Sequence, residues 1–397
     1  MLSRRVGVHH LSLVEDAVQT ALMAAVQAWP QRLPDDRRAW LHRVAYNALM
    51  GDLRQRTSRR RLLQEGNDDA QVKATAVPPP TSSLAGEMQD DMLRMLFVCC
   101  DDVIPPKAQL PLALKTLCGL GVREIAQGLF LSEDNVYKRL QRGRAKLREH
   151  PEVVEVFNAV DVKVRVPAVL RVLYLMFTEG HLTSSPDEKK GVRLDLCAEA
   201  VRLTSMLYAH PLGRSSTTAA LLALMHFHLA RLPGRLTDAG GVLLLEEQDR
   251  QRWDQDAIGT GLQWMQKAAT DDDAVSRYHL EATIAAEHCL APSTAQTAWR
   301  RIADSYALLE TLAPSPMHRL GRALATAEAD CAEAGLALLQ EVEPPTWMQG
   351  ATHWWATLAD LQRRAGRLQE AEANLQLALK LAPTDVVRAL LRRRWQA

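Results

Sequence analysis

Residues 122–148 read VREIAQGLFLSEDNVYKRLQRGRAKLR, and this stretch decides the fold. Its apolar residues recur at intervals of three and four, which predicts two short helices that each bury one face. Ser132 is a good N-cap for the second helix, because its hydroxyl can accept a hydrogen bond from a free backbone N–H. The expected buried positions are Ile125, Ala126 and Leu129 in the first helix and Val136 and Leu140 in the second. This pattern is typical of a helix-turn-helix unit, whose second helix enters the major groove of DNA.

The outward face of the second predicted helix is basic. From residue 138 to residue 148 there are six lysines and arginines and no acid. Arginine and asparagine are the side chains that best match the edges of guanine and adenine. We therefore expect five residues of this face to contact DNA: Asn135, Lys138, Arg139, Arg142 and Lys146. The alternative is a solvated surface helix in an ordinary helical bundle.

The whole chain has the composition of a globular protein. Of its 397 residues, 47% are hydrophobic and 24% are charged, which excludes a disordered chain, a collagen-like fibre and a small disulfide scaffold. Helical spacing of apolar residues recurs almost everywhere, so the predicted fold class is all-α. There is no apolar run of about 18 residues and no secretory signal, so we expect no membrane segment. The six cysteines form no CxxC pair and are expected to be reduced, buried thiols in a cytoplasmic protein.

Charge is divided unevenly along the chain. Residues 1–150 hold 22 Lys and Arg against 17 Asp and Glu, whereas residues 151–397 hold 26 against 30. Such an asymmetry suggests that the N-terminal part binds a polyanion. Nine arginines lie between positions 32 and 61 against three aspartates, which suits a surface that follows phosphates. A solvated helix face is the alternative interpretation of these arginines.

Two more helices are predicted near the N-terminus, over residues 13–29 and 39–61, with Pro30 and Pro34 between them. On the first helix, the expected apolar stripe consists of Val14, Val18, Leu22, Ala25, Val26 and Trp29. On the second helix, it consists of Leu41, Val44, Ala45, Leu49 and Leu53.

A triple proline in a polar, low-complexity stretch predicts a flexible linker. The expected organisation is a helical module at 1–62, the linker at 63–87, a second helical module at 88–150, a helical extension at 151–345 and a terminal repeat at 346–397.

The first 150 residues resemble an extracytoplasmic-function (ECF) sigma factor of the sigma-70 family, a promoter-recognition subunit of bacterial RNA polymerase. The matching motifs are Glu15-Asp16-Ala17-Val18-Gln19, Ala39-Trp40-Leu41, Val44-Ala45-Tyr46-Asn47, Asp52-Leu53-Arg54, Arg123-Glu124-Ile125-Ala126 and Val136-Tyr137-Lys138-Arg139-Leu140. The resemblance implies that module 1–62 is region 2, which binds core polymerase and the −10 element, and that module 88–150 is region 4, which binds the −35 element.

The resemblance also implies roles for individual residues of the first module. It implies that Glu15, Asp16 and Gln19 contact core RNA polymerase. It further implies that the −10 element is contacted by Arg37, Arg38, Arg43, Asn47 and Arg54.

The C-terminal part looks like the long extension of one sigma subgroup, which ends in a tetratricopeptide-like region. Residues 352–383 fit one helical repeat of about 34 residues, with Gly366 at its turn. A single repeat cannot bury its own apolar face, so neighbouring helices must stack on it. We expect the stacked helices to offer a concave surface for a protein or peptide partner, and the fused extension to control the sigma factor.

The expected function is a non-catalytic sigma factor that binds core RNA polymerase, recognises promoter DNA and promotes transcription initiation. No cofactor or metal is expected, because His226 and His228 point apart on a helix and no HExxH-like spacing is present. One alternative is a stand-alone helix-turn-helix transcriptional regulator with a repeat-type sensor domain. Another is an enzyme housed in residues 160–345.

Overall fold

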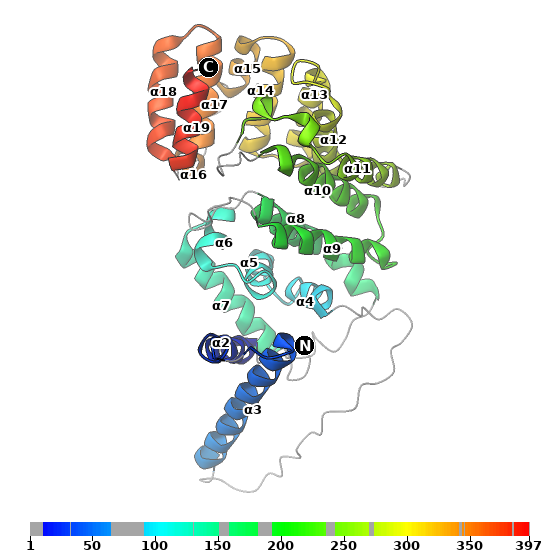
Figure 1. The fold of residues 1–397 in the computed structure, drawn as a ribbon, viewed down its shortest axis with the longest axis vertical. Helices are drawn as coiled ribbons and strands as arrows, with labels where there is room; N and C mark the ends of the chain where they lie inside the picture. Colours follow the sequence, from blue (N-terminus) through cyan, green and yellow to red (C-terminus); the bar gives the residue numbers. More distant parts are fainter. Residues whose placement is uncertain are drawn as a thin grey trace. The chain divides into compact units, whose positions relative to one another are not determined.

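The computed structural model describes residues 11–31, 33–64, 91–129, 131–150, 159–181, 193–235, 243–269, 274–340, 344, 346–382 and 385–396. Every regular element in these ranges is a helix (Figure 1), which confirms the predicted all-α fold class. The chain divides into two compact units. The first comprises residues 1–122 and 133–169, and the second comprises residues 123–132 and 170–397.

The first unit holds five whole helices and the start of a sixth among its described residues. They are α2 (Leu11–Ala28), α3 (Arg37–Gln64), α4 (Asp91–Cys99), α5 (Pro106–Leu117), α7 (Glu133–Glu149) and the N-terminal half of α8 (Ala159–His181). The predicted linker, 63–87, lies outside the described residues apart from its first two positions, which end α3.

The second unit begins with α6 (Val122–Gly128) and the rest of α8. Its other elements are α9 (Leu194–Ala209), α10 (Ser216–Arg235), η3 (Leu245–Glu247), η4 (Arg250–Arg252), α11 (Gln255–Ala268), α12 (Arg277–Leu290), α13 (Trp299–Leu312), α14 (Pro316–Ala329), α15 (Ala332–Gln340), α16 (Thr346–Gln349), α17 (Thr352–Arg364), α18 (Leu368–Leu381) and α19 (Asp385–Gln396).

Helices α2 and α3 pack together through small side chains. Their shared core consists of Leu13, Val14, Ala17, Ala21, Ala45 and Leu49, with Leu41 and Val44 partly buried against it. The predicted stripe on α3 is confirmed at these positions, whereas the Leu53 side chain lies outside the described residues.

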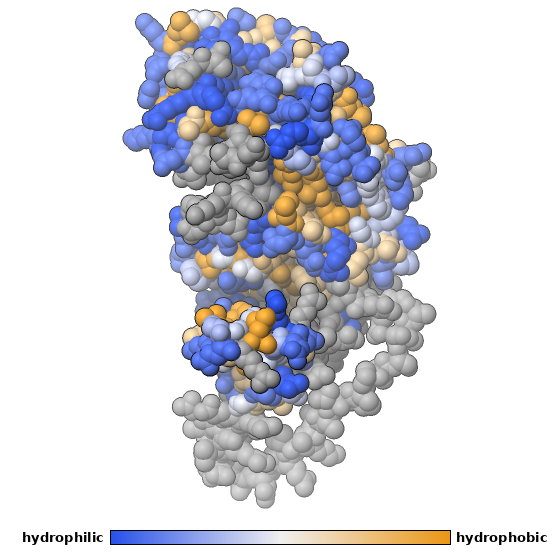
Figure 2. Space-filling model, viewed as in Figure 1, coloured by the Kyte–Doolittle hydropathy of each residue, from blue (hydrophilic) through white to orange (hydrophobic). Residues whose placement is uncertain are grey.

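The predicted stripe on α2 is wrong in part. Val14 and Ala25 are buried, but Val18, Leu22 and Val26 are 39%, 47% and 76% exposed. The alanines of α2 face α3 instead, because small side chains allow two helices to approach closely and still fill the space between them. The large apolar side chains of α2 therefore form a patch on the surface, which Figure 2 shows in orange over this helix.

Helix α10 forms the core of the first part of the second unit. Thirteen of its 20 residues are buried, since α9, α11 and α12 all pack against it. A helix that is apolar on nearly every side is stable only when it is covered on nearly every side. Gly261 of α11 allows close packing here, because a Cβ at this position would lie 2.7 Å from the Phe227 ring.

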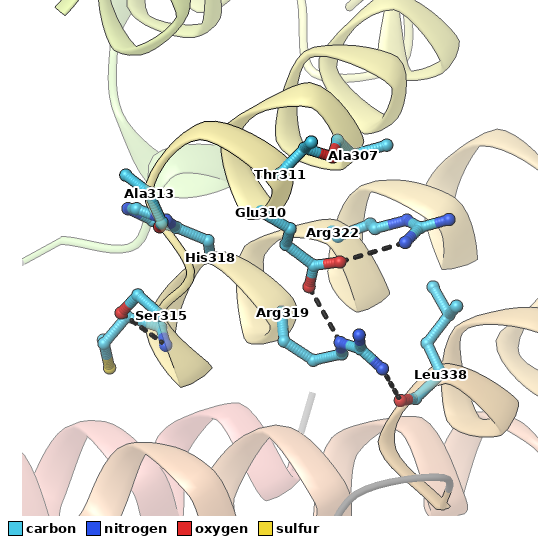
Figure 3. A network of polar contacts seen from close by, with 10 residues as sticks. Ala307, Glu310, Thr311, Ala313, Ser315, His318, Arg319, Arg322 and Leu338 are labelled. Carbon is cyan, nitrogen blue, oxygen red and sulfur yellow. Dashed lines mark hydrogen bonds and ion pairs between the residues drawn. The ribbon is translucent and has the colours of Figure 1, made fainter. Parts of the chain in front are cut away.

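Successive helices further along the chain are joined by polar contacts as well as by apolar packing. Glu310 of α13 accepts hydrogen bonds from Arg319 Nε at 2.8 Å and from Arg322 Nη1 at 3.0 Å, both on α14 (Figure 3). Arg319 also donates to the Leu338 carbonyl oxygen of α15 at 3.3 Å. Glu310 and Arg319 therefore join α13, α14 and α15 through one network of polar contacts.

Helices α17 and α18 form the helical hairpin that the sequence predicts over 352–383. The turn falls at Gly366, whose φ of 75° lies in the left-handed region that favours glycine. Ala371, Leu375 and Ala378 are buried, as the repeat pattern requires. The buried carboxylate of Asp360 attracts the last helix, because Arg394 of α19 donates to it at 3.1 Å.

Five of the six cysteines are buried free thiols, as predicted: Cys99, Cys100, Cys118, Cys197 and Cys289. Cys331 is exposed, which corrects the prediction for that residue, since it lies in the turn before α15 and not on a packed face.

Two glycine substitutions are expected to change stability in opposite directions. Gly335→Ala in α15 would place a Cβ 2.4 Å from the Ala323 carbonyl oxygen, and should lower the free energy of unfolding by about 1–3 kcal/mol. Gly259→Ala in α11 meets no atom within 4 Å and should raise it by about 0.5–1 kcal/mol through helix propensity. Urea denaturation of the two variants measures both effects, and equal shifts would contradict the packing of α15 on α14.

Candidate nucleic-acid interface

Helix α7 is held by burial of one side of its surface. It begins at Glu133, directly after Ser132, so Ser132 occupies the predicted N-cap position. Val136 and Leu140 are buried as predicted, and Gly143 and Leu147 extend the same side. The Gly143 position lies against α5, since a Cβ there would be 3.3 Å from Leu112 Cδ2. The packing of α7 on α5 therefore fixes which face of α7 points outward.

The five residues predicted to contact DNA lie on the unburied part of α7. Asn135, Lys138 and Arg142 are exposed, and Arg139 and Lys146 are partly exposed. Arg139 Nε donates to Asn135 Oδ1 at 2.9 Å and Nη1 to the Lys107 carbonyl oxygen at 3.4 Å. The helix thus brings all five to one accessible surface, which we call the α7 basic face.

The charges of the α7 basic face differ in how far they are neutralised. Lys138 pairs with Asp134 at 2.7 Å, and Lys146 pairs with Glu149 at 2.6 Å. The hydrogen bond from Lys146 lowers the pKa of the Glu149 carboxyl. Within the described ranges, no acidic side chain pairs with Arg142. Exposed pairs contribute little stability, so phosphate can displace these acids at small cost. Arg142 can bind a phosphate without first losing an acidic partner.

The residues that the resemblance assigns to the −10 element lie on α3. Arg37, Arg43 and Asn47 are exposed, and Arg43 and Asn47 share one face of the helix because they are four residues apart. Arg38 and Arg54 belong to the same helix, but their side chains lie outside the described residues.

The residues assigned to polymerase binding lie on α2. Asp16 and Gln19 are exposed. Glu15 is partly buried and forms an ion pair of 2.6 Å with Arg144 of α7. This contact joins the two predicted modules of the N-terminal half, and no local sequence pattern predicts it because 129 residues separate the partners.

The exposed apolar strip of α2 was not predicted from the sequence. Val18, Leu22 and Val26 recur every four residues beside Gln19, and Met23 is 64% exposed. Helical periodicity placed most of this strip in the core, because it does not distinguish a face that meets α3 from a face that meets another protein. A large exposed apolar patch indicates an interaction site.

A buried ion pair attaches the start of α8 to the turn between α4 and α5. Arg165 Nη2 lies 2.5 Å from Asp101 Oδ2, and both side chains are less than a tenth exposed. Asp101 Oδ1 also accepts a hydrogen bond from the Val103 backbone N–H at 2.9 Å. The segment that follows the helix-turn-helix is therefore packed against this module through a charged contact.

A second set of contacts joins α6 to the elements that follow it. Glu124 Oε1 lies 3.7 Å from Arg193 Nη1, just before α9. A Cβ at Gly128, the last residue of α6, would lie 3.6 Å from Glu179 Oε2 of α8. The first helix of the helix-turn-helix is thus in contact with the C-terminal extension.

The described residues contain no group of three or more His, Cys, Asp and Glu that could hold a metal ion. Among the same residues, none of the helices has the length and apolar character needed to cross a membrane.

The amino-acid sequence matches two family models and one known protein. Residues 97–147 match sigma-70 region 4, and residues 165–269 match a family of unknown function, DUF6596. An uncharacterized protein of Rhizobium meliloti (strain 1021), R00370, is 33% identical over 402 residues, which cover 96% of this chain and 89% of that protein. No solved structure matches the chain.

The chain therefore contains a sigma-70 region 4 domain, which supports membership of the sigma-70 family. It belongs to the same family as the Rhizobium protein. A region 4 domain implies interaction with RNA polymerase and promoter DNA in general, and it points to a non-enzymatic DNA-binding transcription factor.

Removing the charge of Asp101 should destabilise the protein more than removing the whole ion pair. Asp101→Asn keeps an acceptor for the Val103 N–H but leaves Arg165 buried without a counter-charge, which should cost about 3–5 kcal/mol. The double variant Asp101→Leu with Arg165→Met should recover most of that loss. Chemical denaturation of the single and double variants provides the test, and additive losses would show that the pair is not a coupled contact.

Proposed function

We propose that this protein is an ECF-type sigma factor that binds core RNA polymerase, recognises the −35 and −10 promoter elements and promotes transcription initiation. The observation that carries the proposal is the α7 basic face, which lies inside the region 4 match and has its apolar side fixed against α5. In the proposed complex, Asn135, Arg139 and Arg142 contact base edges. Lys138 and Lys146 contact phosphates.

The proposed polymerase surface is α2. Asp16 and Gln19 supply polar contacts, and the neighbouring strip of Val18, Leu22 and Val26 supplies apolar area that becomes buried on binding. Arg37, Arg38, Arg43, Asn47 and Arg54 of α3 are the proposed −10 contacts. The exposed arginines there suit a DNA backbone, since guanidinium groups bind phosphate through two hydrogen bonds.

We further propose that the C-terminal extension controls promoter binding. Two ion pairs support this proposal. Arg165 binds Asp101, and Arg193 lies near Glu124 on the first helix of the helix-turn-helix. The α17–α18 hairpin is proposed to be a tetratricopeptide-like repeat that, with its neighbours, binds a protein or peptide partner. Because α8 is continuous from 159 to 181, a chain cut at residue 160 would leave Asp101 without its partner.

The control role is therefore tested in the full-length chain. Arg193→Gln removes the weaker contact with Glu124 and is expected to change promoter-dependent transcription while the far-UV circular dichroism spectrum stays the same. Unchanged transcription under every condition would count against control through this contact.

Arg142→Ala should weaken binding to a −35 element by about 1–3 kcal/mol and relax the preference for one base pair. The reason is that Arg142 is exposed and has no acidic partner within the described ranges. The measurement is fluorescence anisotropy with promoter and scrambled duplexes at several salt concentrations. Gln141→Ala, an exposed neutral neighbour, is the matched control and should bind as the unmodified protein does.

Asp16→Ala combined with Gln19→Ala should abolish co-purification with core RNA polymerase and transcription, while the isolated protein remains folded, because both side chains are exposed. A stand-alone helix-turn-helix regulator does not need a polymerase-binding surface on α2, so it would keep its activity in this double variant. Arg392→Ala, an exposed substitution on α19, serves as a control and should leave polymerase binding intact. The same assay thus separates the two functions.

A further inference from the structure

A second concentration of positive charge lies inside the second unit, away from the α7 basic face. His228, Arg231 and Arg235 stand on one face of α10, at positions i, i+3 and i+7. His181 of α8 lies beside this face, with its ring centroid 4.8 Å from that of His228. His288 of α12 and Arg250 of η4 complete the group, which we call the inner basic cluster.

Arg231 has no counter-charge among the described residues. Its Nε atom is buried and has no hydrogen-bond partner, and no carboxylate within the described residues pairs with it. Its guanidinium lies over the Trp253 ring, 5.8 Å from the centroid. The ionisable groups of acidic type that interact electrostatically with the Arg231 guanidinium are the Cys289 thiol and the Tyr306 phenol. Burial raises the pKa of Cys289 to about 11 and that of Tyr306 to about 12, so both are uncharged at neutral pH.

The other two arginines, Arg235 and Arg250, donate hydrogen bonds to backbone carbonyl oxygens. Neither forms an ion pair with a carboxylate of the described residues. Arg235 Nη1 donates to the His181 carbonyl oxygen at 2.9 Å and lies 3.1 Å from His181 Nε2. Arg250 Nη1 donates to the carbonyl oxygens of His288 and Ala291 at 2.6 and 2.7 Å, and its guanidinium stacks on Trp253 at 4.6 Å. Both guanidinium groups are therefore held in place, and no acid among the described residues pairs with them.

The histidines of the inner basic cluster are neutral donors. Burial, and next to it the charge of Arg231, lowers the pKa of His228 to about 3 and that of His288 to about 3. Burial also lowers the pKa of His181. Since His181 Nε2 accepts from Arg235, its proton resides on Nδ1, which is buried without a partner. Within the part of the chain that the structure describes, the Nδ1 atoms of His228 and His288 and the Trp253 Nε1 are likewise buried without partners.

These observations favour a ligand of definite chemistry. Buried polar atoms without a hydrogen-bond partner are costly, and proteins rarely keep them without a use. A metal ion does not suit the site, because three guanidinium charges surround the imidazoles. An oxyanion does suit it, because its oxygens accept two hydrogen bonds from one guanidinium and further ones from imidazole and indole N–H groups.

We propose that the inner basic cluster is a binding site for a small oxyanion, a phosphate or carboxylate group of a small molecule, with Arg231 as its principal ligand. Arg235 and Arg250 provide additional positive potential, and the three neutral histidines provide additional polar contacts. Arg231, His228 and His288 are each partly exposed, so the cluster is not sealed from solvent. The site belongs to the extension and not to the region 4 domain, so it offers the extension an input separate from DNA.

The test is thermal unfolding of the full-length protein in sodium phosphate, sodium succinate or sodium chloride, at one pH and one ionic strength. Phosphate, succinate or both should raise the melting temperature in a saturable way above the chloride value. At ten times the dissociation constant, the rise should be roughly 3–6 °C. The anion that gives the larger rise in melting temperature, phosphate or succinate, identifies the kind of oxyanion that the site prefers.

Two variants separate a ligand-binding arginine from a structural one. Arg231→Met should fold, unfold at the same or a higher temperature in chloride because a buried unpaired charge is gone, and lose the response to the oxyanion. Arg252→Gln, an exposed substitution next to Trp253, should keep the full response, which also controls for general salt effects. The proposal is overturned if neither anion exceeds chloride, or if Arg231→Met responds as the unmodified protein does.

Discussion

The buried carboxylate of Asp101 is the contact on which the arrangement of α4, α5 and the start of α8 depends. It binds the Val103 backbone N–H and the Arg165 guanidinium, and the Gln109 amide donates to the Asp101 carbonyl oxygen at 3.0 Å. The turn between α4 and α5 and the start of α8 are therefore fixed together. Because α5 supports α7, the orientation of the α7 basic face follows from the same turn.

A buried ion pair is a weak source of net stability but a strong constraint on geometry. Two charges lose their hydration when they are buried, and the loss is offset only if the partners meet in one arrangement. For this protein, that arrangement joins the region 4 domain to the extension that follows it. This contact supports the proposal that the extension controls the region 4 domain.

The two basic regions of the protein differ in their surroundings, and this difference supports different proposed ligands for them. Charges on the α7 basic face are exposed, and two of them are balanced by neighbouring acids that a phosphate backbone can replace. Charges in the inner basic cluster are largely enclosed and lack acids within the described residues. An exposed strip fits a long polyanion, whereas a largely enclosed cluster fits a small anionic group.

The sequence by itself determined the local structure: the all-α class, the two helices of the helix-turn-helix with Ser132 between them, and the turn at Gly366. These features depend on periodicity, capping and backbone preference, which act over a few neighbouring residues. Only the tertiary structure decided which face of α2 is buried, that Glu15 binds Arg144, and that His181, His228 and His288 meet around Arg231. Such contacts join residues far apart in the chain, and they depend on how side-chain volumes fit together, which no local pattern records.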